Sequence, residues 1–136
     1  MNVSDTVKQF FATRERTNIL ATAGADGKVN VAAFGSPALE GDDRVSMLLG
    51  DNRTWANLGQ NPRAAFLIIM HGGTGMGMKG CRLYVKVART ADSGPPFEAR
   101  MAEIRARIGD AADMLKHLVV FDILEARPIL DLGQGV

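Results

Sequence analysis

Apolar and polar side chains alternate along Lys79–Thr90, which is the periodicity of a β-strand with one buried and one exposed face. Other segments with strand patterns follow one another through short turns, so that strands outnumber helices along the chain. The regular strand–helix–strand order of a parallel sheet is absent. The sequence therefore predicts a mainly β structure of the α+β class, built on an antiparallel sheet.

The segments with strand patterns are Thr17–Ala23, Lys28–Ala38, Arg44–Leu49, Ala64–Met70, Lys79–Thr90 and Leu118–Leu130. The first two flank Gly24-Ala25-Asp26-Gly27, and a short turn with an Asp-Gly pair between extended segments is typical of a β-hairpin. In the last strand, Leu118-Val119-Val120-Phe121 is apolar on both faces. One face can enter a barrel core, and the other needs cover from a helix or from a second subunit.

Helical patterns occupy three places between these strands. Residues 3–14 are amphipathic, and Arg53–Leu58 is followed by the stop signals Gly59 and Pro62. The third helix opens at Ser93-Gly94-Pro95-Pro96 and ends at Gly109. Its apolar stripe consists of Phe97, Met101, Ile104 and Ile108. A six-stranded antiparallel barrel with peripheral helices is the most economical arrangement, because closing a barrel removes exposed strand edges.

Composition excludes several classes of function. The 136 residues fit one domain, 1–136, and the formal net charge of +1 without any basic block does not favour nucleic acid as a partner. No apolar run could span a membrane and no export signal is present, so a cytoplasmic location is expected. Cys81 is the single cysteine, and the two histidines, His71 and His117, lack metal-binding spacing. We therefore expect no metal site.

The segment Leu49–Leu58 carries the clearest ligand-binding pattern. A strand ends at Gly50, and either Asp51 or Asn52 can cap the helix that follows. The start of that helix presents free backbone N–H groups and the positive end of its dipole, which together favour a phosphate.

The side chains of the same turn add to this pattern. Arg53 contributes a permanent cation and Thr54 a neutral hydroxyl donor, while Asn57 lies one turn later on the same face. The alternative is an ordinary capped surface helix, in which Asn57 is a solvent-exposed residue or a local loop clamp.

Asn30-Val31-Ala32, in the second strand, forms another candidate site. Small residues there let a flat heterocycle lie against the strand, whose backbone N–H and C=O groups could pair with the polar edge of the ring. The alternative is a strand with one outward-facing asparagine. The glycine-rich stretch Gly72–Met78 lacks the ending of a P-loop and indicates a hairpin or lid, in which Met76 and Met78 could cover an aromatic ring or contact a neighbouring subunit.

Reactive side chains with an identifiable partner are absent from the pattern. Cys81 falls on the apolar face of its strand, as expected for an inert buried thiol. His71 has no identifiable acid–base partner, and Trp55 is either a core residue or a shield for a cofactor. No covalent catalyst is found, so the residues leave open whether the chain is an enzyme.

Together, these segments resemble the FMN-binding split-barrel family, which includes the pyridoxamine 5′-phosphate oxidases and smaller FMN-binding proteins. The resemblance is closest in Leu20–Ala32 and Asn52–Ala64, where a polar-basic-polar turn precedes Asn-Leu and Asn-Pro-basic pairs. It implies a six-stranded antiparallel split barrel that binds FMN at a homodimer interface. The cofactor-binding residues that it implies are Asn30, Val31, Ala32, Asp51, Asn52, Arg53, Thr54 and Asn57. Arg53 and Thr54 would hold the phosphate, and the strand residues would line the isoalloxazine ring.

The C-terminal segment departs from the oxidases that act on pyridoxamine phosphate. Glu125–Leu130 lacks the histidine of their Arg-x-His signature, so oxidation of this substrate is not expected. The leading hypothesis is a dimeric flavoprotein, an oxidoreductase or electron carrier that passes electrons or hydride between an unidentified donor and acceptor. One alternative is a non-catalytic cofactor-binding or sensor module for haem or a deazaflavin, with His71 or His117 as the axial ligand of a haem. A purely structural dimerisation domain is another.

Overall fold

A computed structural model describes residues 1–136. The strands are β1 (Arg16–Ala23), β2 (Val29–Phe34), β3 (Ala38–Glu40), β4 (Arg44–Leu49), β5 (Arg63–Met70), β6 (Gly80–Ala91) and β7 (His117–Pro128). The α-helices are α1 (Asp5–Ala12), α2 (Arg53–Gln60) and α3 (Pro95–Ile108), and two 3-10 helices are η1 (Gly75–Gly77) and η2 (Gly109–Met114). The strands form one antiparallel sheet in the order β2-β1-β5-β6-β7-β4-β3.

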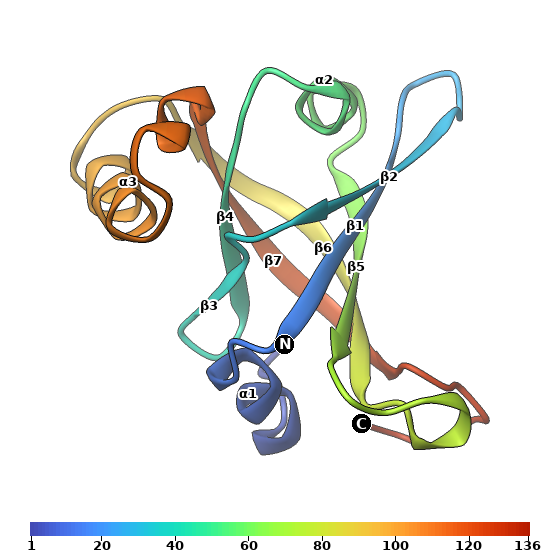
Figure 1. The fold of residues 1–136 in the computed structure, drawn as a ribbon. Helices are drawn as coiled ribbons and strands as arrows, with labels where there is room; N and C mark the ends of the chain where they lie inside the picture. The colour runs from blue at the N-terminus through green and yellow to red at the C-terminus, as the bar shows by residue number, and fades with distance from the viewer.

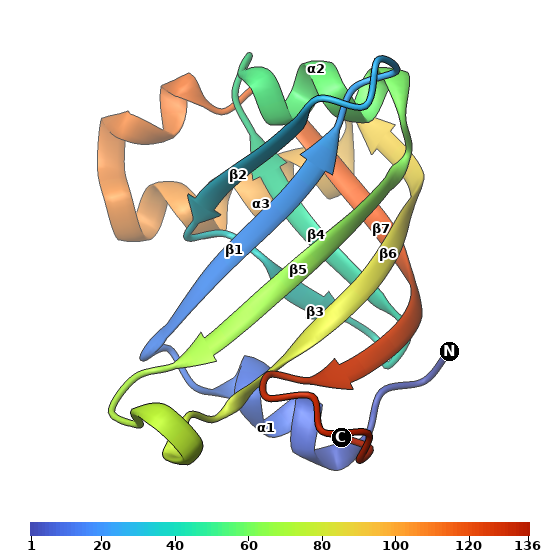
Figure 2. The ribbon, with the colours of Figure 1, turned by 90° about the vertical axis from the view of Figure 1, so that its right-hand side faces the viewer.

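The sheet curls into a barrel that is open between its edge strands, β2 and β3 (Figure 1). In the view of Figure 2, α2 lies at one end of the barrel, and α1 and η1 lie at the other. Helix α3 packs outside the barrel. The predicted α+β split barrel is therefore confirmed.

The strand count differs from the prediction, because the expected strand Lys28–Ala38 is two strands. β2 pairs with β1, whereas β3 pairs with β4 at the opposite edge of the sheet. Gly35-Ser36-Pro37 connects them, and Pro37 has no N–H to donate to a ladder. The Ser36 hydroxyl accepts a hydrogen bond from the Leu48 N–H (3.0 Å) and lies 3.2 Å from the Leu48 carbonyl oxygen. This link carries the chain across the open side of the barrel and makes seven strands rather than six.

The barrel core consists of apolar side chains from nearly every strand. Phe66 and Phe121 pack edge to face with ring centroids 5.4 Å apart. The predicted alternation of β6 is confirmed, since Cys81, Leu83 and Val85 are fully buried. Burial raises the pKa of the Cys81 thiol to about 12, so this thiol is an inert core group.

Helix α3 covers the second apolar face of β7. Val119 and Phe121 belong to the barrel core, whereas Leu118 and Val120 pack with Ile104 of α3. The sequence left open whether a helix or a second subunit covers this face, and in the structure helix α3 covers it. The predicted stripe of α3 holds at Ile104 but not at Ile108, which is half exposed at the end of the helix. No helix combines the length and the hydrophobicity that crossing a lipid bilayer requires.

Candidate functional site

Asn52 caps the first turn of α2. Its side chain accepts a hydrogen bond from the Trp55 N–H (2.8 Å), which decides between the two caps that the sequence allowed. The backbone N–H groups of Arg53 and Thr54, in the same turn, donate to no protein acceptor. Two donors and the positive end of the helix dipole are thus free at this point.

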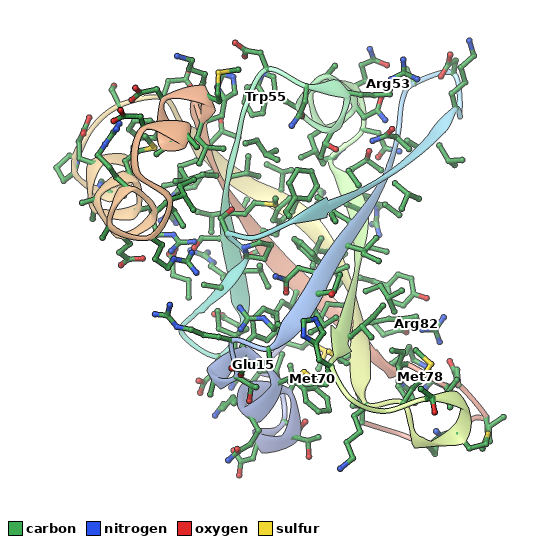
Figure 3. All side chains as sticks on the ribbon, viewed as in Figure 1. Glu15, Arg53, Trp55, Met70, Met78 and Arg82 are labelled. Atoms are coloured by element: carbon green, nitrogen blue, oxygen red, sulfur yellow. The ribbon has the colours of Figure 1, made fainter.

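An open groove of about 640 Å³ lies between this turn and the β1–β2 hairpin; we call it the α2 groove. Arg53 and Asn57 line it from the helix, and Lys28 and Val29 line it from the hairpin. Figure 3 shows Arg53 at the end of the barrel where α2 meets the hairpin. The Arg53 side chain is exposed and forms no ion pair, whereas Lys28 lies 3.8 Å from a carboxylate oxygen of Asp26. Arg53 is therefore the cation that is free to bind an anion there.

Buried polar contacts fasten α2 to the hairpin strands. The Asn57 amide donates to the Thr22 hydroxyl (3.1 Å), and the Asn30 amide donates to the Thr54 hydroxyl (3.4 Å). Thr54 is only 1% exposed and does not line the groove, and its hydroxyl is taken up by the contact with Asn30. The structure thus brings together Asn30 and Thr54, which the sequence placed in separate candidate sites, and gives Asn57 a clamping role.

Strand β2 presents Val31 and its neighbours at an edge of the sheet. Val29 and Val31 are 80% and 66% exposed on its outer face, while Asn30 and Ala32 are half-buried on the other face. No strand pairs with the outer edge of β2. The strand therefore offers exposed apolar side chains and free backbone groups next to the α2 groove.

His117, at the start of β7, contacts the turn that precedes α2, and sequence reasoning missed this role. Its Nε2 lies 2.6 Å from Asp51 Oδ1, and its Nδ1 lies 2.7 Å from Asp92 Oδ1. The ring also stacks on Trp55 at 3.8 Å, within 6° of parallel. Both nitrogens face carboxylate oxygens, an arrangement that favours the imidazolium, in which both nitrogens donate.

Electrostatics at His117 agree with this arrangement. Burial lowers the pKa of the ring, but the hydrogen bonds to Asp92 and Asp51 outweigh burial and raise the pKa above its ordinary value. Asp51 therefore lines the α2 groove with its carboxylate hydrogen-bonded to His117. The only signal in the sequence was a polar residue at the head of the most apolar strand, and the partner carboxylates lie 66 and 25 residues away.

Other residues that the sequence singled out lie elsewhere. His71 is exposed, and its Nε2 lies 2.9 Å from the Thr17 hydroxyl. Met76 is 78% exposed in η1, at the end of the barrel opposite α2 (Figure 2). Gly50 was expected to let the backbone approach a ligand closely. Instead it leaves room for the Met114 carbonyl oxygen of η2, which lies 2.7 Å from the position that a Cβ at Gly50 would occupy.

Comparison with known proteins identifies the fold. No family model and no curated protein matches the sequence. An FMN-binding protein from Syntrophomonas wolfei subsp. wolfei is similar in structure, with a TM-score of 0.83 and 20% identity over 94% of this chain and 86% of that one. HutZ, the heme storage protein from Vibrio cholerae, has a TM-score of 0.68 and 19% identity over 98% and 100% of the two chains. An F420 reductase has a TM-score of 0.71 and 18% identity over 91% and 98%. The chain thus has the split-barrel fold of the pyridoxamine 5′-phosphate oxidase-like proteins.

Proposed function

We propose that this chain is a homodimeric flavoprotein that holds the phosphate of FMN at the start of α2 and its isoalloxazine ring along β2. The observation that carries the proposal is the unpaired Arg53 guanidinium in an open groove, at a helix start where the backbone N–H groups of Arg53 and Thr54 have no protein acceptor. The FMN-binding protein with the same fold supports the choice of cofactor.

The charges of the α2 groove suit a phosphomonoester. Two backbone N–H groups and one guanidinium can donate charge-assisted hydrogen bonds to its oxygens. Asp26 and Asp51 also line the groove and would repel the phosphate, but Asp26 lies 3.8 Å from the Lys28 ammonium and Asp51 is hydrogen-bonded to His117. Each carboxylate of the groove thus has a basic partner, which lessens its repulsion of an anion.

The outer face of β2 suits a flat ring and a second subunit. Val29 and Val31 leave apolar surface uncovered, and the edge of β2 carries unpaired backbone groups that match the polar edge of a heterocycle. A second copy of the chain packed over this strand would bury both valines and exclude water from the ring. FMN would then lie at the dimer interface.

FMN, when bound, supplies hydride or single-electron transfer between a donor and an acceptor. The chain itself binds the phosphate through Arg53 and the start of α2 and orients the ring along β2. The Asn57–Thr22 and Asn30–Thr54 contacts hold the two parts of the site in register. A protein that binds and orients a flavin in this way would act as an oxidoreductase or an electron carrier.

Haem is the second candidate, because a heme storage protein has the same fold. A haem iron needs an axial ligand, and both nitrogens of His117 face carboxylates, whereas His71 has a single partner, Thr17. The haem alternative therefore predicts a Soret band that His71→Ala removes. If the cofactor were a deazaflavin, His71→Ala would not change the absorption spectrum, which would be that of the deazaflavin.

The test is FMN titration of the purified protein, followed by quenching of flavin fluorescence. Wild-type protein should bind FMN, and Arg53→Ala should weaken binding about tenfold to a hundredfold, since hydrogen bonds to charged groups contribute about 1.5–3 kcal/mol. Arg63→Ala is the matched control, because Arg63 is exposed and lies outside the groove. Failure of wild-type protein to bind FMN, or equal binding by Arg53→Ala, would contradict the proposal.

A further inference from the structure

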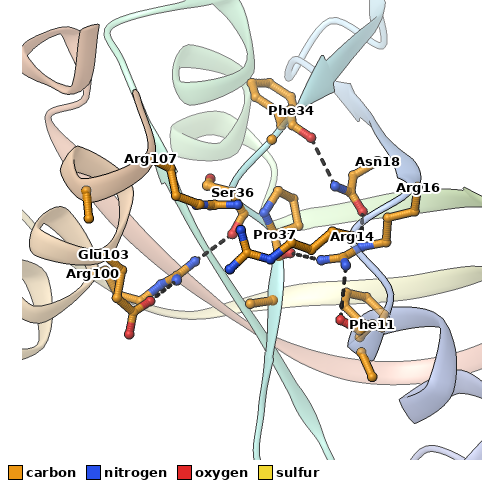
Figure 4. Close-up of a pocket in the computed structure, with 14 residues that line it drawn as sticks. Phe11, Arg14, Arg16, Asn18, Phe34, Ser36, Pro37, Arg100, Glu103 and Arg107 are labelled. Carbon is orange, nitrogen blue, oxygen red and sulfur yellow. Dashed lines mark hydrogen bonds and ion pairs between the residues drawn. The ribbon is translucent and has the colours of Figure 1, made fainter. Parts of the chain in front are cut away.

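A second cavity, of about 570 Å³, lies between the start of β1, the β2–β3 link and α3 (Figure 4); we call it the arginine cavity. Its cationic side chains come from the segment before β1, from β1 itself and from α3: Arg14, Arg16, Arg100 and Arg107. Glu103 is the one acidic residue in its lining. The chain as a whole has 16 basic and 15 acidic residues, so this excess of positive charge is local.

Two of these arginines build the walls of the cavity. The Arg16 guanidinium donates to the Asn18 side chain (3.0 Å), to the Phe11 carbonyl (3.0 Å) and to the Pro37 carbonyl (2.8 Å). Arg100 pairs with Glu103 (2.6 Å) and donates to the Ser36 carbonyl. Both therefore fasten the β2–β3 link to its surroundings and have little capacity left for a ligand. The buried Nε of Arg100 has no partner at all.

Arg14 and Arg107 are in the opposite situation. Both are exposed, and neither forms an ion pair or a side-chain hydrogen bond, although Figure 4 shows both guanidiniums directed into the cavity. Glu103, the only carboxylate in the lining, is already paired with Arg100. Burial and the charge of Arg107 together lower the pKa of Arg16, so positive charges face one another here without compensation. An anion would supply what the cavity lacks.

The remaining lining defines what kind of anion fits. Phe11, Phe34 and Pro37 contribute apolar surface beside the free guanidiniums. A guanidinium fork binds the paired oxygens of a phosphate or a carboxylate, and apolar walls favour a ligand with a hydrophobic body. We propose that the arginine cavity binds a small organic anion, in which Arg14 and Arg107 hold a phosphate or carboxylate group and the two phenylalanines contact an apolar or aromatic body.

The arginine cavity is separate from the α2 groove. The two share no lining residue, and they lie at opposite ends of β2, with Val29 in the groove and Phe34 in the cavity. The proposal therefore stands whether or not the chain binds a flavin.

The experiment uses phenyl phosphate as the probe and amide NMR of the ¹⁵N-labelled protein as the readout. Shifts at Gly35 and Ser36, in the cavity wall, should report binding. Benzoate should shift the same resonances, whereas benzyl alcohol, which has no charge, should not. Inorganic phosphate should bind at least about tenfold more weakly than phenyl phosphate, because burial of a benzene ring stabilises the complex by roughly this amount or more.

Variants separate the cavity from the groove. The double variant Arg14→Ala/Arg107→Ala should weaken the shifts at Gly35 and Ser36 at least about tenfold, as expected when hydrogen bonds to charged groups are lost. Arg63→Ala should leave them unchanged. Arg53→Ala should remove only shifts at the start of α2. Both truncated side chains are exposed and unpaired, so the unliganded spectrum of the double variant should remain that of the folded protein.

Three outcomes would overturn the proposal. Gly35 and Ser36 could stay unshifted at saturating phenyl phosphate, or the shifts could persist undiminished in the double variant. Benzyl alcohol could also bind as well as phenyl phosphate, which would mean that the arginines do not select an anion.

Discussion

The α2 groove and the arginine cavity both offer a free cation, but the two sites differ in their charges. Two basic and two acidic side chains line the groove, whereas four arginines and one glutamate line the cavity. The groove lies at a helix start, where two backbone N–H groups have no protein acceptor, and adds a single guanidinium, Arg53. The cavity uses side chains alone, two fixed by hydrogen bonds and two free. Backbone donors are set by the fold and cost little to order, whereas free arginine side chains lose rotamer entropy on binding. The groove should therefore depend on backbone geometry, and the cavity on individual side chains.

Within the turn that leads into α2, Gly50 is the position where a substitution should disturb the backbone most. In Gly50→Ala the new Cβ would lie 2.7 Å from the Met114 carbonyl oxygen, a backbone atom that cannot move aside cheaply. We expect the free energy of unfolding to fall by about 1–3 kcal/mol, measured by urea denaturation.

Gly59→Ala, within α2, is the control for this substitution. A Cβ at Gly59 meets nothing within 4 Å, and alanine favours a helix, so stability should rise by about 0.5–1 kcal/mol. A loss of the same size in both variants would mean that the contact at Gly50 is not the cause.

The helix cap is the next test of the groove. Asn52→Ala removes the acceptor of the Trp55 N–H and should lower stability by about 1 kcal/mol. Asn52→Asp keeps a capping oxygen and should keep the stability, but it adds a negative charge at the groove and should weaken FMN binding severalfold. If Asn52→Asp bound FMN as tightly as wild-type protein, the phosphate would not lie at this helix start.

His117 gives the groove a pH dependence that the cavity lacks. Its pKa is raised in the folded protein, so its stabilising effect is complete below its ordinary pKa of about 6.5 and is lost as pH rises through the higher folded value. The difference in unfolding free energy between wild-type protein and His117→Gln should therefore be larger near about pH 5.5 than near about pH 9.

His71→Gln serves as the control, because the His71 side chain is exposed and its one hydrogen-bond partner is the Thr17 hydroxyl. It should not reproduce the pH dependence of His117→Gln. A difference for His117→Gln that grew with pH would show that the ring is held neutral, against the two-carboxylate arrangement.

The smallest effect is expected at Arg107. Since its guanidinium is exposed and unpaired, Arg107→Ala should change the free energy of unfolding by less than about 0.5 kcal/mol. Arg100→Ala should cost more, because it leaves the Ser36 carbonyl without its donor. Thermal denaturation of both variants tests this difference. Equal losses of stability would mean that Arg107, like Arg100, helps to hold the walls of the cavity together.

Local patterns in the sequence were enough to locate most of the fold and the turn at α2. The Gly24–Gly27 hairpin, the cap at Asn52 and the alternation of β6 depend on neighbouring residues, and all three are present in the structure. Pro37 is a local signal for the break between β2 and β3, but the crossing to the opposite sheet edge is held by the contact of Ser36 with Leu48, twelve positions away, which no local pattern encodes.

Side-chain clusters drawn from distant segments escaped sequence reasoning for the same reason. The Asp51–His117–Asp92 contacts join three loops or strand ends, and the arginine cavity joins residues from 14 to 107. The sequence named Asp51 as a candidate helix cap and cofactor-binding residue and His117 as a candidate haem ligand, but it gave no sign that the two side chains are in contact. Only the curl of the sheet and the docking of α3 bring these charges together.

Comparison of FMN with riboflavin, which lacks the phosphate, tests the central claim most directly. Both ligands are titrated into wild-type protein and Arg53→Ala, with flavin fluorescence as the readout. Wild-type protein should bind FMN at least about tenfold more tightly than riboflavin, and Arg53→Ala should narrow that ratio. Equal affinity of wild-type protein for the two flavins would contradict a phosphate anchored at the start of α2.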